Sequence, residues 1–201
     1  MKMKAVIFDF GGVMHSVEGL NTKPTIAEGL GVELESINTV LTDLLEKLGT
    51  GTINEDHFWQ ELRTHTNKDL PDNHKHLIRD NLDKIADLFP EMIQLTHDLK
   101  AKGLKIAVLS NTISPHEEVL RKKNAYDLFD VVILSHNVKI RKPDLKIYRM
   151  VLDELELKGE ECVYIDDLEE NLGPAQELGM KTILAKNPQQ VIEDLNKLIA
   201  D

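Results

Sequence analysis

The stretch of this sequence that decides the fold is Ala5-Val6-Ile7-Phe8-Asp9-Phe10-Gly11-Gly12. Four apolar residues in a row predict a short strand that is buried on both of its faces. The strand ends at Asp9, and Gly11 and Gly12 follow where the chain must turn. We therefore expect a strand of a parallel sheet with a polar side chain at its carboxyl end.

Four further apolar runs of the same kind follow along the chain. They cover residues 105–109, 131–134, 162–165 and 182–184. Helical stretches lie between them: Pro90 opens one and Gly103 closes it, while Ser114, Pro115 and Glu117 predict the capped start of another. This alternation predicts an α/β fold with a Rossmann-like parallel sheet and right-handed crossovers.

The alternation is interrupted between the first two strands. Residues 15–88 show no strand pattern, and their apolar residues recur at helical spacing in three stripes that begin near Leu34, Phe58 and Leu77. We expect a helical subdomain inserted in the first crossover. Residues 1–14 and 89–201 would then form the sheet domain.

The composition narrows the class of protein. The chain has 201 residues, of which 41% are hydrophobic and 29% charged, as is typical of a globular protein. Its 24 basic and 35 acidic residues give a formal net charge of -11, which argues against a nucleic-acid partner. The single cysteine excludes a disulfide scaffold, and no apolar run approaches the ~18 residues of a membrane span. We expect a cytoplasmic protein without a membrane partner, and the sequence predicts no oligomeric state.

Polar side chains follow the predicted strands at their carboxyl ends. Along the chain these are Asp9, Ser110, Asn111, Lys142, Asp166 and Asp167. Because ligands of open α/β sheets bind at this edge, we expect these side chains to lie close together. Neighbouring carboxylates repel one another unless a cation joins them. A set of oxygen ligands suits Mg²⁺, which completes its shell with water and phosphate.

With these residues the sequence resembles the haloacid dehalogenase superfamily of aspartate-nucleophile hydrolases. Four segments match the four motifs of that family in order, namely residues 8–13, 109–112, 141–144 and 164–171. The resemblance extends from residue 4 to about residue 185. The insert at 15–88 lies where subfamily I of the superfamily has its helical C1 cap. The resemblance therefore implies a capped, phosphatase-like hydrolase.

The resemblance also implies a role for each matched residue. Asp9 would be the nucleophile that forms an aspartyl-phosphate, and Lys142 would neutralise charge on Asp9 and on the phosphate. Ser110 and the amide of Asn111 would hold the phosphoryl group. Mg²⁺ would be bound by Asp9, the carbonyl of Gly11 and Asp167, with Asp166 acting through a bound water. The implied partner is a small phosphorylated substrate such as a sugar phosphate.

One position departs from the family pattern. Most phosphatases of the family carry a second aspartate two residues after the nucleophile, as general acid and base, and here that residue is Gly11. The loss of a positioned acid or base costs about 10²–10⁴ in rate. Three explanations stay open: substrates with good leaving groups, such as anomeric sugar phosphates or acyl phosphates; a substitute acid at His15; or a weak or inactive protein.

Three other functions compete with the phosphatase. A haloacid dehalogenase needs no metal, and the dehalogenases of the family lack the acidic pair that Asp166 and Asp167 form here. A phosphomutase needs the acid and base that Gly11 has replaced. A non-catalytic regulatory protein that binds Mg²⁺ and phosphate is compatible with all four motifs. The sequence favours the phosphatase over these three.

Overall fold

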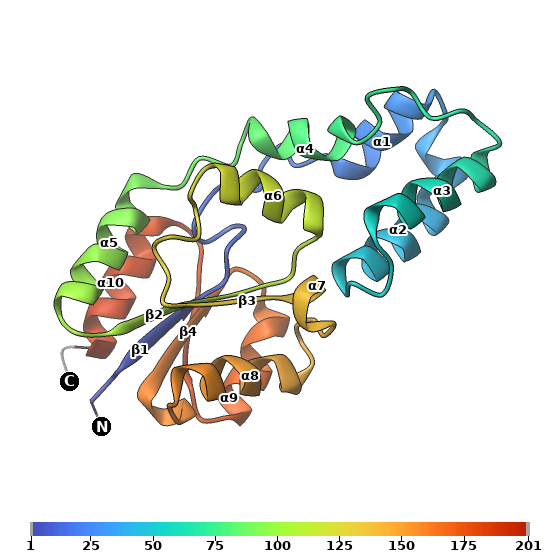
Figure 1. Cartoon of the computed structure of the whole chain (residues 1–201). Helices are drawn as coiled ribbons and strands as arrows, with labels where there is room; N and C mark the ends of the chain where they lie inside the picture. Colours follow the sequence, from blue (N-terminus) through green and yellow to red (C-terminus); the bar gives the residue numbers. More distant parts are fainter. Residues whose placement is uncertain (1, 200–201) are drawn as a thin grey trace.

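A computed structural model describes residues 2–199 of the chain. Five parallel strands form one sheet in the order β3-β2-β1-β4-β5 (Figure 1). They are β1 (Ala5–Phe8), β2 (Lys105–Ser110), β3 (Val131–Leu134), β4 (Cys162–Asp166) and β5 (Lys181–Leu184). The predicted α/β, Rossmann-like fold is confirmed, and each strand lies within one residue of its expected bounds.

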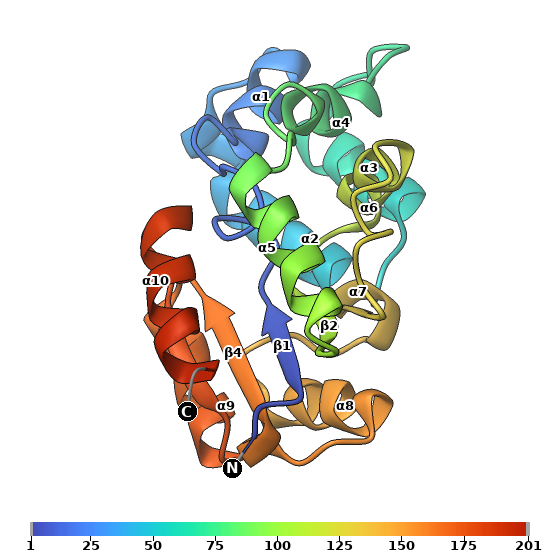
Figure 2. The ribbon, with the colours of Figure 1, turned by 90° about the vertical axis from the view of Figure 1, so that its left-hand side faces the viewer.

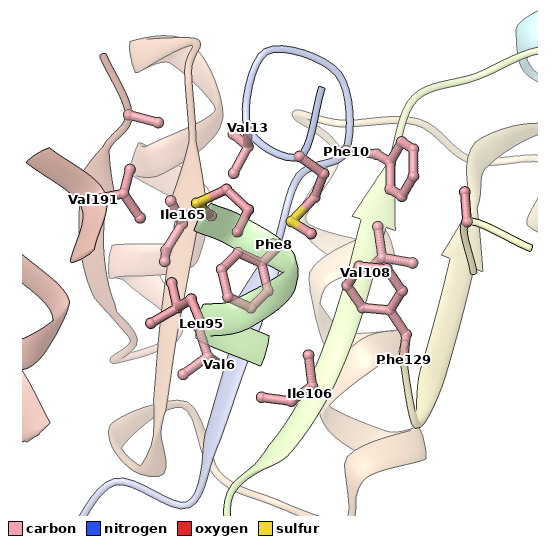
Figure 3. Packing of buried hydrophobic residues seen from close by; sticks show 14 of the residues in the cluster. Val6, Phe8, Phe10, Val13, Leu95, Ile106, Val108, Phe129, Ile165 and Val191 are labelled. Carbon is pink, nitrogen blue, oxygen red and sulfur yellow. The ribbon is translucent and has the colours of Figure 1, made fainter. Parts of the chain in front are cut away.

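Helices cover both faces of the sheet. α5 (Pro90–Ala101) and α10 (Pro188–Ile199) pack on one face, and α8 (Leu145–Leu155) and α9 (Leu172–Glu177) pack on the other. Val6 and Phe8 of β1 belong to the first apolar cluster, which Figure 3 shows, whereas Ala5 and Ile7 belong to the second. Since successive side chains of a strand point to opposite faces, burial of both faces requires a continuous apolar run.

The start of α6 (Ser114–Lys122) differs from the prediction. The helix begins at Ser114 itself, with Ile113 at the N-cap position and no side-chain capping bond, so the predicted cap at Ser114 is wrong. Glu117 does not complete a capping box. Its carboxylate lies 2.7 Å from Nε2 of His136 and 2.7 Å from the guanidinium of Arg121. These hydrogen-bonding partners outside the first turn explain the orientation of Glu117.

The inserted segment between β1 and α5 forms four helices. They are α1 (Thr22–Leu30), α2 (Leu34–Gly49), α3 (Glu55–Thr66) and α4 (His76–Asp83), and they pack around an apolar cluster of their own. Figure 2 shows them beyond the end of the sheet to which the strand arrowheads point. No helix in residues 2–199 is long and apolar enough to cross a membrane. The exact boundaries of the insert stay a prediction.

The two connections to the insert run side by side. His15 and Leu88 form an isolated β-bridge, and the amide of Phe89 donates to the carbonyl of Met14 at 2.9 Å. Three short elements complete the fold: α7 (Ser135–Val138) after β3, and the 3₁₀ turns η1 (Gly159–Glu161) and η2 (Glu169–Asn171) on either side of β4.

Candidate active site

The carboxyl ends of β1 and β4 bring three carboxylates together. Phe8 lies beside Ile165 in the strand register, and the amide of Asp9 donates to the carbonyl of Ile165 at 2.8 Å. Asp166 ends β4 and Asp167 follows it. One oxygen from each of Asp9, Asp166 and Asp167 lies within 4.8 Å of the other two. The predicted gathering of these side chains is therefore present.

Lys142 reaches this cluster from the segment after α7. Its ammonium nitrogen lies 2.7 Å from Oδ1 of Asp9 and 2.7 Å from Oδ2 of Asp166, and the residue is only 2% exposed. A buried ammonium is stable only when it is paired and hydrogen-bonded, as this one is. Lys142 therefore links the end of β1 to the end of β4.

The side chain of Asn111 holds the backbone of Lys142. Its Nδ2 donates to the carbonyl of Lys142 at 3.0 Å, and its Oδ1 accepts from the amide of Lys142 at 2.8 Å. The peptide bond from Lys142 to Pro143 is cis. The backbone amide of Asn111, which these two bonds do not involve, is the group predicted to contact a phosphoryl group. Ser110, one residue earlier, is buried at the end of β2.

Asp166 is the most completely bonded carboxylate of the site. Besides Lys142, it accepts from the hydroxyl of Tyr164, from the amide of Leu168 at 2.9 Å, and from Nδ2 of Asn171 at 3.0 and 3.1 Å. Sequence reasoning did not assign Tyr164 or Asn171 to the site. The available signal was spacing, because Tyr164 stands two residues before Asp166 in one strand and shares its face.

Asp167 is placed differently from its neighbour. It is half-buried, and its carboxylate lies against Gly12 in the loop after β1. Gly12 has φ of 77°, and a Cβ atom there would lie 2.2 Å from Oδ2 of Asp167. A side chain at residue 12 would therefore be strained and would displace this carboxylate. The second glycine of the opening stretch makes room for Asp167.

The charges of the cluster do not balance. The pKa of Asp9 is raised to about 6, because burial and the neighbouring Asp166 carboxylate raise it more than Lys142 lowers it. Burial and then Asp166 also raise the pKa of Asp167. Three carboxylates face a single ammonium, so a divalent cation would restore neutrality. The all-oxygen donor set and the half-exposed position of Asp167 fit Mg²⁺, which keeps several waters.

Gly11, where the family's usual acid and base is missing, and His15, the candidate substitute, lie in different settings. A Cβ atom on Gly11 would lie 3.0 Å from Cγ1 of Val17, a side chain that is 42% exposed. His15 is 3% exposed, its Nδ1 lies 2.7 Å from the carbonyl of Ser16, and burial lowers its pKa. Its ring packs on Phe10 at 5.4 Å between centroids. Between residues 2 and 199 no hydrogen bond joins His15 to Asp9.

Sequence comparison agrees with this geometry. A profile of haloacid dehalogenase-like hydrolases matches residues 3–179. The match covers most of the chain and includes every residue of the carboxylate cluster. The chain belongs to the haloacid dehalogenase-like hydrolase family.

Named relatives differ in how much of their length the chain spans. Acyl-CoA dehydrogenase family member 10 of Mus musculus is 30% identical over 98% of this chain, which spans 19% of that protein. A sesquiterpene phosphatase of Aspergillus oryzae is 27% identical over 98% of this chain and 96% of its own length. A phosphorylated carbohydrates phosphatase of Thermotoga maritima is 27% identical over 90% of this chain and 84% of its own.

Solved structures share the fold. A haloacid dehalogenase family enzyme of Bacteroides thetaiotaomicron, in complex with magnesium and inorganic phosphate, superposes with a TM-score of 0.78. The match covers 92% of this chain and 94% of that enzyme's chain, at 23% sequence identity. At that identity the likeness shows the arrangement of sheet and helices.

Proposed function

We propose that this protein is a Mg²⁺-dependent phosphatase of small phosphorylated metabolites, in which α1–α4 form the C1 cap of a subfamily I member. The observation that carries the proposal is the sharing of one buried lysine by two of three clustered carboxylates. A cation is needed to balance such a cluster, and a phosphate monoester is a ligand that a cation and Lys142 can bind together. The two named phosphatases that match nearly end to end support the same activity.

The metal ligands in this proposal are Asp9, Asp167 and the carbonyl of Gly11. Asp166 is assigned a positioning role, because its oxygens already accept bonds from Lys142, Tyr164, Leu168 and Asn171. It can reach the metal through a bound water. The bound Mg²⁺ would supply Lewis-acid stabilisation of the phosphate oxygens.

Asp9 acts as the nucleophile in the proposed reaction. Lys142 holds Oδ1, and the other carboxylate oxygen attacks phosphorus while the bond between phosphorus and the alcohol oxygen breaks. The departing oxygen takes the electron pair and then a proton from water. A second water hydrolyses the aspartyl-phosphate, which releases phosphate and restores the carboxylate. Ser110 and the amide of Asn111 hold the phosphoryl group throughout.

The glycine at residue 11 predicts how the rate of hydrolysis depends on the leaving group. Since residue 11 cannot donate a proton to the leaving alcohol, the rate depends on the pKa of that alcohol. Acyl phosphates and anomeric sugar phosphates, whose leaving groups are good, are expected to be turned over fastest. A rate that does not change with leaving-group pKa would show that another acid acts, and His15 would be the first residue to replace.

The test is phosphate release from a panel of acyl, sugar and nucleoside phosphates with Mg²⁺. We expect release by the unmodified chain and none after Asp9→Asn or after addition of EDTA. Asp72→Asn, which changes an exposed carboxylate outside the cluster, serves as the matched control. The thermal unfolding midpoint of each variant shows whether it is folded.

Two outcomes would overturn the proposal. Phosphate release that persists in Asp9→Asn would remove Asp9 as nucleophile. Mg²⁺ binding without release from any ester would favour the non-catalytic regulatory protein, which is the alternative that Gly11 supports.

A further inference from the structure

A cavity of about 260 Å³ lies between the insert and the sheet domain. It is lined from the insert and its connection by Leu20, Thr22, Leu45 and Gly49, and from the sheet domain by Asn111, Thr112, Ile113, His116, Ser135 and Arg141. Asn111 and Thr112 directly follow Ser110. The cavity therefore begins beside the residue at which the proposed function places the phosphate.

Contacts across the cavity fix its walls. The hydroxyl of Ser135 donates to the carbonyl of Gly49 at 2.6 Å and lies 3.0 Å from the amide of Thr112. Ile113 is buried in the apolar cluster of the insert, although it precedes α6 of the sheet domain. The cavity thus has defined walls on both sides, which a specific binding site requires.

The size of the cavity limits the ligand. Sites for drug-sized ligands have about 300–1,000 Å³, so this cavity suits a smaller group, of up to about six carbon atoms. Leu20, Leu45 and Ile113 supply an apolar wall. Such a wall can pack against the C–H face of a small ring or polyol, and it is too short for a long hydrocarbon chain.

The polar groups of the cavity are mainly neutral hydrogen-bonding groups. Thr22, Thr112 and His116 line it, and the one charged lining residue, Arg141, is 3.8 Å from the carboxylate of Glu46. Burial, and then the nearby His15 and Arg79, lower the pKa of His116 to about 4, so its ring is neutral near pH 7. A neutral imidazole offers one donor and one acceptor, which suits hydroxyl groups better than a second anion.

One ring nitrogen of His116 takes no part in the hydrogen bonds within the described part of the protein. Its Nε2 is buried and has no hydrogen-bond partner anywhere in residues 2–199. Buried polar atoms are nearly always paired, so an unpaired one beside a cavity points to a binding role. The ring stands on the first turn of α6, three residues after Ile113, and it lines the cavity.

From these observations we infer that the cavity binds the hydroxylated leaving group of a small sugar or polyol phosphate, and that His116 is a specificity-determining residue for it. This inference rests on the proposed phosphatase function, since it places the ester's phosphate at Ser110. It commits to polyhydroxylated groups of up to about six carbons rather than long isoprenoid chains or bisphosphates.

The test compares His116→Leu, His116→Gln and the exposed control His97→Leu on three esters. These are a hexose phosphate, acetyl phosphate and a C15 isoprenoid monophosphate. We expect the ratio of kcat/KM for hexose phosphate to that for acetyl phosphate to fall about tenfold in His116→Leu, through KM, because a neutral hydrogen bond is lost. His116→Gln should recover part of the ratio, and His97→Leu should keep it.

Binding to the Asp9→Asn protein separates the two proposals. We expect its Kd for hexose phosphate to rise about tenfold when His116→Leu is added, and its Kd for inorganic phosphate to stay the same. Binding that depends on His116, together with no turnover of any ester by the unmodified chain, would refute the phosphatase and keep the cavity assignment. Three results would each overturn the inference. The first is that His116→Leu leaves both the ratio and the Kd unchanged. The others are equal losses of kcat/KM on hexose phosphate and acetyl phosphate, and a preference for the isoprenoid ester.

Discussion

The carboxylate cluster and the neighbouring cavity are built in opposite ways. In the cluster, Lys142 and Asp166 are buried and bonded to several partners at once. In the cavity, His116 has an unpaired buried nitrogen, and Arg141 has only a distant partner. The first arrangement holds reacting groups in one geometry, which is what charge stabilisation in a transition state requires. The second leaves hydrogen-bonding capacity for a ligand.

Removal of Lys142 should break the cluster most severely. Lys142→Met leaves Asp9 and Asp166 buried without their shared cation, and a broken buried ion pair costs about 3–5 kcal/mol of unfolding free energy. Turnover should fall by about 10²–10³ because the transition-state charge loses a fixed cation. Denaturant unfolding and kcat measure the two effects. Lys146→Met, at an exposed lysine, is the control, and a tenfold or smaller loss of kcat in Lys142→Met would contradict the prediction.

Asp166 and Asp167 offer a sharper comparison within the cluster. Asp166→Asn weakens the bonds to Lys142, Tyr164 and Asn171 and should cost about 2–3 kcal/mol of unfolding free energy. Asp167→Asn removes a half-buried carboxylate whose pKa is raised, so it should change stability by less than about 1 kcal/mol and weaken Mg²⁺ binding instead. Urea unfolding and Mg²⁺ titration of both variants separate these roles. Equal losses of stability would mean that the two aspartates share one role.

The unfolding free energy should depend on pH through His116, which lines the cavity. The pKa of His116 is lowered to about 4 in the folded chain and is near 6.5 in the unfolded chain. As the pH falls from 6.5 to 4, the unfolded chain takes up a proton that the folded chain does not, so stability is lost across this window and is unaffected above it. The full loss is about 3 kcal/mol. The unfolding free energy of His116→Gln, measured from pH 7 to 4, should fall less steeply, and parallel curves would contradict the prediction.

Gly11→Asp should produce the smallest effect. A carboxylate at residue 11 restores the family's usual acid and base, but its Cβ would lie 3.0 Å from Cγ1 of Val17. Val17 is exposed and can move, and Gly11 does not have the positive φ of Gly12. We expect about tenfold faster hydrolysis of esters with poor leaving groups, and no gain for acyl phosphates. An unchanged rate in a folded variant would indicate that another acid already acts.

Local patterns predicted the sheet and the residues at its edge. Continuous apolar runs indicated strands buried on both faces, and the polar residues after them, such as Asp9 and Asp166, had to meet because parallel strands end at one edge. The same reasoning did not find the bonds from Tyr164 and Asn171 to Asp166, or from Asn111 to the backbone of Lys142. Those bonds depend on side-chain direction and loop shape. The predicted cap at Ser114 was wrong because a local rule was applied where Glu117 has tertiary partners.

By itself the sequence determined the α/β sheet, the helical insert between β1 and β2, and the set of residues gathered at the carboxyl edge. Periodicity and strand ends carry this information, since burial on one or both faces constrains residue type along the chain. Only the tertiary structure decided that Lys142 pairs with Asp166 as well as with Asp9, that Gly12 makes room for Asp167, and that a cavity beside His116 lies between the insert and the sheet domain. These features join segments far apart in the chain, and their geometry follows from how whole elements pack, which no local pattern encodes.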